Sequence, residues 1–171
     1  MIELPTARTP GSYRIALVCL GNICRSPMAD VVLSARIDEA GLSGRVGVDS
    51  CGTGDWHVDG PMDDRAAATL IAAGYDASRH RARQFARTWL DDHDLVLAMD
   101  AQNLADIGGR TGDGRVRLFR DLDPVEPGGD VPDPYYGGDA GFEEVLAMVE
   151  RTAAAIVAAL HRESTSGWTT S

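Results

Sequence analysis

The short segment that begins at Cys19 carries the residue types best suited to chemistry in this chain. Cys19 ends an apolar run, and Arg25 follows after five intervening residues. Ser26 and Pro27 come next, and both are typical of the start of a helix. A loop between a strand and a helix N-terminus gathers backbone N–H groups that bind phosphate-like anions without a metal. The order of residues therefore predicts an anion-binding loop with a thiol at its base.

Cys19 and Arg25 suit complementary roles in such a loop. The positive field favours a thiolate over a thiol, so we expect Cys19 to be a nucleophile at neutral pH. The planar guanidinium of Arg25 can grip two phosphoryl oxygens and neutralise charge in a transition state. No G-K-S or G-K-T triplet is present here, which disfavours a nucleotide-binding P-loop. A structural cysteine followed by a helix cap is the plainer alternative.

Residues 19–27, C-L-G-N-I-C-R-S-P, resemble the signature of the low-molecular-weight protein tyrosine phosphatases, and the chain looks like a bacterial, actinobacterial-like member. The resemblance covers about residues 13–160. It implies a protein tyrosine phosphatase that uses no metal and no other cofactor. It also implies that the loop binds phosphate through Leu20, Gly21, Asn22, Ile23, Cys24 and Arg25.

Apolar runs and helical patterns predict a single α/β domain. Strands are expected near residues 14–19, 46–50, 95–99 and 116–119, and helices at 28–40, 63–73, 101–107 and 142–160. Together they predict a parallel four-stranded sheet with helices on both faces, and the chain of 171 residues is long enough to bury one core. We expect the domain to span residues 13–162, with a mobile extension at 1–12 and a disordered tail at 163–171 that includes Trp168.

Charge and cysteine content narrow the class of protein. There are 26 acidic residues against 16 basic ones, and the net charge of -10 disfavours binding to nucleic acid. Three cysteines are an odd number in a chain without a signal-peptide pattern. We therefore expect free thiols, a cytoplasmic protein and no association with a membrane.

The loop that follows the second predicted strand is expected to approach the anion site. Loops after the carboxyl ends of parallel strands line one crevice, so Trp56 and His57 are expected near Cys19. Composition alone would favour Trp56 as a ring that covers the edge of the core. The resemblance instead implies that Trp56 forms one wall of the substrate slot.

A set of polar residues is expected to support the phosphate loop. A lone histidine such as His80 is more often structural than catalytic. The resemblance agrees, because in the family the histidine of an H-x-A-R-Q segment bonds the serine and asparagine that shape the loop. It implies that Ser26, Ser50 and His80 act together with Asn22 to hold the loop and the thiolate in place.

The segment V-P-D-P-Y-Y contains the candidate proton donor. Expelling an alkoxide or phenolate from phosphate needs an acid, and a carboxyl group kept protonated by nearby negative charge can provide it. On spacing alone, Asp133 would be assigned a turn-forming role before Pro134. The resemblance implies that Asp133 is the general acid and that Tyr135 lines the slot, with Tyr136 beside it.

The two other cysteines, Cys24 and Cys51, are predicted to have different roles. Cys24 lies on the same loop as Cys19, so we expect the two to form a reversible disulfide under peroxide. Cys51 stands where the family's D-S-A-G-T pattern has alanine, and it is expected to be inert in the core unless it lies close to Cys19.

The sequence thus predicts hydrolysis of phosphotyrosine in proteins through a cysteinyl-phosphate, with phosphate or other oxyanions as product or inhibitors. One alternative is an arsenate reductase of the same fold, which relays a disulfide through two further cysteines, whereas only Cys51 lies downstream of the loop. Another is a phosphoarginine phosphatase, but such relatives carry threonine where this chain has Ile23. A catalytically silent phosphotyrosine-binding module is the third, and the presence of Cys19, Arg25 and Asp133 argues against it.

Overall fold

The computed structural model describes residues 2–166 and contains one parallel sheet. Its strands are β1 (Tyr13–Cys19), β2 (Val46–Gly52), β3 (Leu95–Ala98) and β4 (Val116–Leu118), in the order β2-β1-β3-β4. The central strands are nearly continuous apolar runs because both of their faces are buried. The predicted four-stranded parallel sheet is confirmed.

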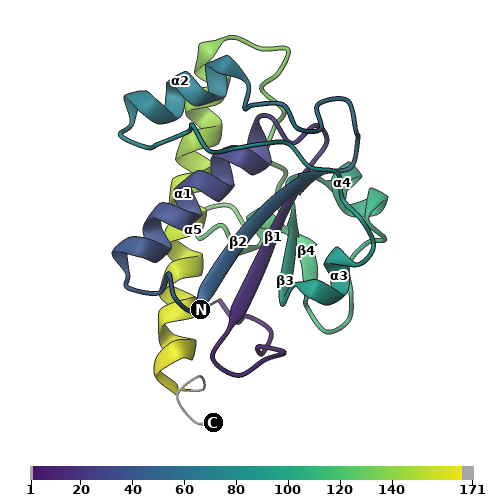
Figure 1. Cartoon of the computed structure of the whole chain (residues 1–171). Coiled ribbons are helices and arrows are strands. Elements are labelled where there is room, and N and C mark those ends of the chain that lie inside the picture. The colour runs from purple at the N-terminus through teal and green to yellow at the C-terminus, as the bar shows by residue number, and fades with distance from the viewer. Residues whose placement is uncertain (1, 167–171) are drawn as a thin grey trace.

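Helices cover both faces of this sheet, as predicted (Figure 1). On one face lie α1 (Arg25–Glu39), α2 (Asp64–Ala72) and α5 (Asp139–Ser166). On the other lie α3 (Trp89–Asp92) and α4 (Ala101–Asp106). A short 3-10 helix, η1 (Phe119–Leu122), follows β4 directly.

Alternation along β1 divides the core into two clusters. Ile15 and Leu17 point to the α1 and α5 face, where Met28 and Phe142 pack in the same cluster. Val18 belongs to the cluster on the α3 and α4 face. All of these side chains are fully buried, and each contributes about 1.5–3 kcal/mol through removal of apolar surface from water.

The N-termini of α1 and α2 are fixed in different ways. α1 begins at Arg25, not at Met28 as predicted, because the loop backbone turns straight into the helix and Met28 N donates to Cys24 O at 3.0 Å. α2 begins one residue after Asp63, whose carboxylate accepts from Arg65 N at 2.8 Å. Asp63 therefore caps the helix instead of beginning it.

The two ends of the chain differ from the predicted extension and tail. Leu4 is buried, Tyr13 Oη donates to Pro5 O at 2.9 Å, and Arg8 N donates to Asp94 Oδ1 at 2.7 Å, so residues 2–12 lie against the domain. α5 continues to Ser166, past the predicted end of the domain, and residues 163–166 are helical. Positions 167–171, with Trp168, lie outside the described residues. No helix within residues 2–166 is long and apolar enough to cross a membrane.

The parallel arrangement places the carboxyl ends of β1, β2 and β3 at one edge of the sheet. The loop after β1 leads into α1, and the loop after β2 leads to α2. The long segment after η1 returns to the same edge, where Val131 N donates to Met99 O at 2.7 Å. Three segments far apart in the sequence therefore meet at this edge.

Candidate active site

The loop at the end of β1 surrounds the thiol of Cys19, which is almost inaccessible to solvent (2% exposed). Asn22 adopts a left-handed backbone conformation with φ of 56°, and its N–H points to Cys19 Sγ at 3.3 Å. The hydroxyl of Ser26, in the first turn of α1, lies 2.9 Å from the same sulfur. The thiol therefore sits between two potential donors and the N-terminus of a helix.

Asn22 is fully buried and uses its polar groups within the protein. Its backbone oxygen is 2.6 Å from His80 Nε2, and its side-chain oxygen accepts from Arg83 N at 2.9 Å. Its side-chain nitrogen donates to Ser26 Oγ at 2.9 Å and to Ser50 Oγ at 3.0 Å. These bonds offset the left-handed backbone of Asn22, which an L-residue rarely adopts. The network joins the phosphate loop to α1, β2 and the segment before α3.

The hydroxyl of Ser26 has a proton to share near the sulfur. An amide NH2 group can only donate, so Ser26 Oγ accepts from Asn22, and its own proton can go to Cys19 Sγ at 2.9 Å or to Cys51 O at 3.4 Å. Burial lowers the pKa of His80, which keeps its ring neutral and lets Nε2–H donate to Asn22 O.

The first residues after β2 support the loop from below. Thr53 N donates to Cys19 O and Gly54 N to Leu20 O, both at 2.9 Å. Gly52 has no side chain at the point of contact, where a Cβ would lie only 2.7 Å from Leu20 O and 3.0 Å from Asn22 N. Any larger residue at position 52 would displace the loop backbone.

Arg25 is buried and is held by two segments from elsewhere in the chain. Its Nη1 donates to Asp100 Oδ2 at 2.6 Å and to Val131 O at 3.1 Å, and its Nη2 lies 3.6 Å from Asp133 Oδ2. Asp100 also caps α4 by accepting from Asn103 N at 2.7 Å. The guanidinium plane is therefore fixed before any anion binds.

The contact of Asp100 with Arg25 was not predicted. The available signal was its position, since it follows directly after the buried strand β3 and the carboxyl ends of parallel strands converge. His57 was expected near the site but was not assigned to it, and it now lines the cavity. A Cβ on Gly21 would lie 3.3 Å from His57 Cδ2, so the imidazole packs on the bare backbone of the loop.

A cavity of about 280 Å³ opens above Cys19. Its base is formed by loop residues and its rim by side chains from the other two segments. The lining consists of Cys19, Leu20, Gly21, Ile23, Cys24, Arg25, Trp56, His57, Asp133, Tyr135 and Tyr136. The fold therefore brings together the predicted nucleophile, arginine, acid and slot residues, and the three predicted supporting residues lie beneath them.

The rim is aromatic and exposed. Trp56 is 69% exposed and Tyr136 is 92% exposed, while Tyr135 packs edge-to-face on Tyr136 with ring centroids 4.9 Å apart. Arg65 on α2 anchors this rim by donating to Tyr135 O at 2.9 Å. Asp133 Oδ1 accepts from Tyr135 N at 3.1 Å, which turns the carboxyl group towards the cavity.

The remaining cysteines occupy different surroundings. Cys24 lines the cavity together with Cys19, and burial raises the pKa of Cys24 to about 12. Cys51 packs in the cluster on the α3 and α4 face, whereas Cys19 belongs to the cluster on the opposite face. Burial also raises the pKa of Cys51. In the part of the chain that the structure describes, no group of three or more His, Cys, Asp or Glu side chains could hold a metal ion.

Comparison with known proteins identifies the family. The model for low molecular weight phosphotyrosine protein phosphatases matches residues 14–166. The chain belongs to this family. It is 48% identical over 162 residues to a low molecular weight protein-tyrosine-phosphatase of Streptomyces coelicolor, covering 91% of this chain and 98% of that protein.

Solved structures of protein tyrosine phosphatases have the same fold as this chain. The crystal structure of YfkJ from Bacillus subtilis matches with a TM-score of 0.82 and 32% identity, covering 92% of this chain and 99% of that one. A protein tyrosine phosphatase from Entamoeba histolytica, crystallised with Hepes in its active site, gives a TM-score of 0.82 at 28% identity, covering 90% and 99%. The protein is thus a phosphatase by family, and the loop of residues 19–25 lies in the same cavity as the aromatic rim.

Proposed function

We propose that this phosphatase hydrolyses phosphotyrosine in proteins through a phosphocysteine formed on Cys19. The observation that carries the proposal is the convergence of Cys19, Arg25 and Asp133 on one cavity with an aromatic rim. The thiol lies at its base, the guanidinium beside it and the carboxyl group above.

In the first step, the Cys19 thiolate attacks phosphorus in line with the tyrosine oxygen. The S–P bond forms as the P–O bond breaks, and Asp133 gives its proton to the departing phenolate. The loop N–H groups of residues 20–25 and the Arg25 guanidinium stabilise the three equatorial oxygens. Asp100 keeps the guanidinium in the required plane through its 2.6 Å bond.

In the second step, water attacks the phosphorus of the phosphocysteine. Asp133, now a carboxylate, takes a proton from that water, the S–P bond breaks and phosphate is released. The hydroxyl of Ser26, 2.9 Å from the sulfur, donates to the leaving thiolate and lowers the barrier. Phosphate and similar oxyanions compete for the same loop.

The cavity suits an aromatic substrate. Trp56, Tyr135 and Tyr136 provide stacking walls, and Ile23 places an apolar group among the residues of the loop. The substrates are then phosphotyrosine-containing proteins, and the free thiols favour a cytoplasmic setting. A disulfide relay of the arsenate reductase type lacks support, because Cys51 packs on the opposite face from Cys19.

Two variants test the assignment. Cys19→Ser should lose turnover yet still bind vanadate or phosphate, since the loop amides and Arg25 remain. Asp133→Asn should slow hydrolysis of aryl phosphates more strongly as the leaving group becomes more basic. Steady-state rates on a series of phenyl phosphates measure this, with the exposed Asp139→Asn as the matched control. An equal loss for good and poor leaving groups would remove Asp133 from the general-acid role.

A further inference from the structure

Residues 132–137, the acid segment, carry Asp133 and contain neither helix nor strand. Within this segment Gly137 N donates to Pro134 O at 3.0 Å, and Asp133 Oδ1 accepts from Tyr135 N at 3.1 Å. The segment therefore folds into a turn that fixes the Asp133 carboxyl group relative to Tyr135. These bonds are internal, so they do not place the turn relative to the phosphate loop.

Arg65, a half-buried residue of α2, supplies bonds that do reach the acid segment. Its Nη2 donates to Tyr135 O at 2.9 Å and its Nη1 to Gly137 O at 3.4 Å. Its guanidinium also lies over the ring of Tyr135, 5.4 Å from the centroid, and over that of Phe142 at 4.8 Å. Among the hydrogen bonds formed within residues 2–166, the two from Arg65 are the ones that reach the acid segment from another part of the chain.

Arg65 is in turn held by Asp63, the capping residue of α2. Nε and Nη2 of Arg65 donate to Oδ1 and Oδ2 of Asp63 at 3.2 and 3.1 Å, and this two-point contact fixes the guanidinium plane. Asp63 N donates to Ile23 O of the phosphate loop at 2.9 Å. A continuous series of bonds therefore runs from the phosphate loop through Asp63 and Arg65 to Tyr135, whose N–H holds Asp133.

We propose that Arg65 is a positioning residue for the general acid: its guanidinium fastens the acid segment to the N-terminus of α2 and so keeps the Asp133 carboxyl group facing the cavity above Cys19. Arg65 does not line that cavity, and its bonds to the acid segment go to backbone oxygens. A planar fork can meet two carbonyl groups and a carboxylate together, whereas a lysine ammonium is a single point charge. The inference rests on the proposed function for the roles of Cys19 and Asp133.

The ion pair between Arg25 and Asp133 cannot replace this anchor. Arg25 Nη2 lies 3.6 Å from Asp133 Oδ2, which is longer than a hydrogen bond. In the first step of the proposed reaction Asp133 is protonated, and a neutral carboxyl group no longer forms an ion pair. The bonds from Arg65 do not depend on the charge of Asp133. They therefore hold the side chain in place both as the acid of the first step and as the base of the second.

The test is kcat/KM for two aryl phosphates, p-nitrophenyl phosphate with a good leaving group and phenyl phosphate with a poor one. Arg65→Met removes the guanidinium and keeps an apolar stem. It should lower kcat/KM for phenyl phosphate by about tenfold to a hundredfold, as expected for a displaced catalytic group, and for p-nitrophenyl phosphate by about threefold at most. Alkylation of Cys19 by iodoacetamide needs no proton donor and should keep its wild-type rate.

Two further variants make the test specific to positioning. In an Asp133→Asn protein, Arg65→Met should add no further dependence on the leaving group, because no acid remains to be positioned. Arg65→Lys keeps the positive charge but cannot meet Asp63 and both carbonyl groups together. It should therefore show the same selective loss on phenyl phosphate as Arg65→Met.

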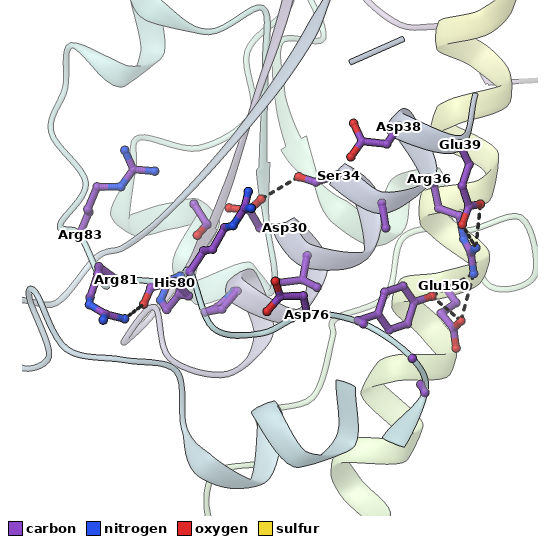
Figure 2. Close-up of a pocket in the computed structure, with 18 of the residues that line it drawn as sticks. Asp30, Ser34, Arg36, Asp38, Glu39, Asp76, His80, Arg81, Arg83 and Glu150 are labelled. Atoms are coloured by element: carbon purple, nitrogen blue, oxygen red, sulfur yellow. Dashed lines mark hydrogen bonds and ion pairs between the residues drawn. The ribbon is translucent and has the colours of Figure 1, made fainter. Parts of the chain in front are cut away.

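Arg36 provides the matched control. It lies on α1 and lines a second cavity of about 900 Å³, where it forms ion pairs with Glu39 and Glu150 (Figure 2). Like Arg65, it combines an ion pair with a place over a tyrosine ring, that of Tyr75. Arg36→Met loses the same kinds of contact away from the acid segment. It should keep the wild-type ratio of the two kcat/KM values.

An equal loss on both substrates in Arg65→Met, a wild-type ratio in Arg65→Lys, or a fall in the alkylation rate of Cys19 to match the loss in kcat/KM would overturn the proposal. If Arg65→Met does not fold, Arg65→Lys decides, alone and combined with Asp133→Asn. Failure of the proposed function would look different, because Cys19→Ser would then retain turnover, or Asp133→Asn would slow all leaving groups equally, whatever the Arg65 variants show.

Discussion

At the scale of single residues, the site depends on side chains whose hydrogen bonds are complete before any substrate binds. The backbone oxygen and the side chain of Asn22 form hydrogen bonds with His80, Arg83 and two serines. Arg25 is held by Asp100 and by the backbone at Val131. Groups that are fixed in advance need no reorganisation in the transition state, which is how electrostatic stabilisation becomes large.

Ile23 is expected to select the substrate class. A guanidinium beside this apolar side chain would lack a partner, which typically costs about 1–3 kcal/mol per buried polar group. The wild type should therefore hydrolyse phosphotyrosine peptides at least about tenfold better than phosphoserine or phosphoarginine peptides, a difference of about 1.4 kcal/mol. Ile23→Thr should gain activity on phosphoarginine, as measured by kcat/KM.

The control for Ile23→Thr is Ile71→Thr, at an exposed isoleucine of α2 outside the cavity. This variant should keep the wild-type preference. A wild type that prefers phosphoarginine, or an Ile23→Thr variant that gains nothing on it, would show that Ile23 is not the selector.

At the scale of elements, the phosphate loop is a rigid connection between β1 and α1, supported by the end of β2. It also carries two thiols, and we expect peroxide to join Cys19 and Cys24 in a reversible disulfide. Because burial raises the pKa of Cys24 to about 12, Cys24 remains a thiol and Cys19 oxidises first. Cys24 then captures the sulfenic acid of Cys19, with loss of water.

Mass spectrometry of the oxidised protein measures the pairing, and a thiol reductant should restore activity. Cys51→Ser is the control and should still form the disulfide, since Cys51 packs on the other face of the sheet. Recovery of both loop thiols unpaired, or of Cys19 paired with Cys51, would contradict this expectation.

A second contact between elements fastens η1 to α5. The carboxylate of Asp123 is buried and accepts from Arg120 Nε at 3.0 Å and from Arg151 at 2.8 and 2.9 Å. Although burial opposes ionisation, the bonds from Arg151, Val125 N and Arg120 hold the pKa of Asp123 well below its usual value. Asp123→Asn should lower the free energy of unfolding by about 1–3 kcal/mol, because Arg120 and Arg151 lose a charged acceptor while Arg120 keeps its ion pair with Glu126.

The contribution of Asp123 to the free energy of unfolding depends on pH. Asp123 has a lower pKa in the folded than in the unfolded chain, so its contribution is complete above about pH 4 and is lost as the pH falls below that value. Urea unfolding at neutral and acidic pH measures the loss, with the exposed Asp106→Asn as control. Equal stability of Asp123→Asn and wild type at neutral pH would show that the contact does not stabilise the fold.

At the scale of the whole molecule, the parallel sheet explains both what the sequence predicted and what it missed. The central strands β1 and β3 could be predicted because burial on both faces leaves apolar runs in the sequence, whereas the edge strand β2 gave a weaker pattern with Asp49 and Ser50 in it. The helix ends could not be predicted. α1 begins where the backbone of the preceding loop becomes helical, and α5 continues beyond the apolar residues that indicated it. The loop motif indicated Cys19 and Arg25. The bond from Arg25 to Asp100 spans 75 residues and follows from strand order, which local patterns do not contain.

In the proposed reaction, phosphate passes through Cys19 while Asp133 moves the protons. Asp133→Asn should form the intermediate from a substrate with a good leaving group and hydrolyse it slowly, because the base of the second step is missing. The direct measurement is mass spectrometry of Asp133→Asn quenched in acid during turnover of p-nitrophenyl phosphate. We expect phosphate attached to Cys19. Turnover without any covalent phosphate on Cys19, or with phosphate on another residue, would contradict it.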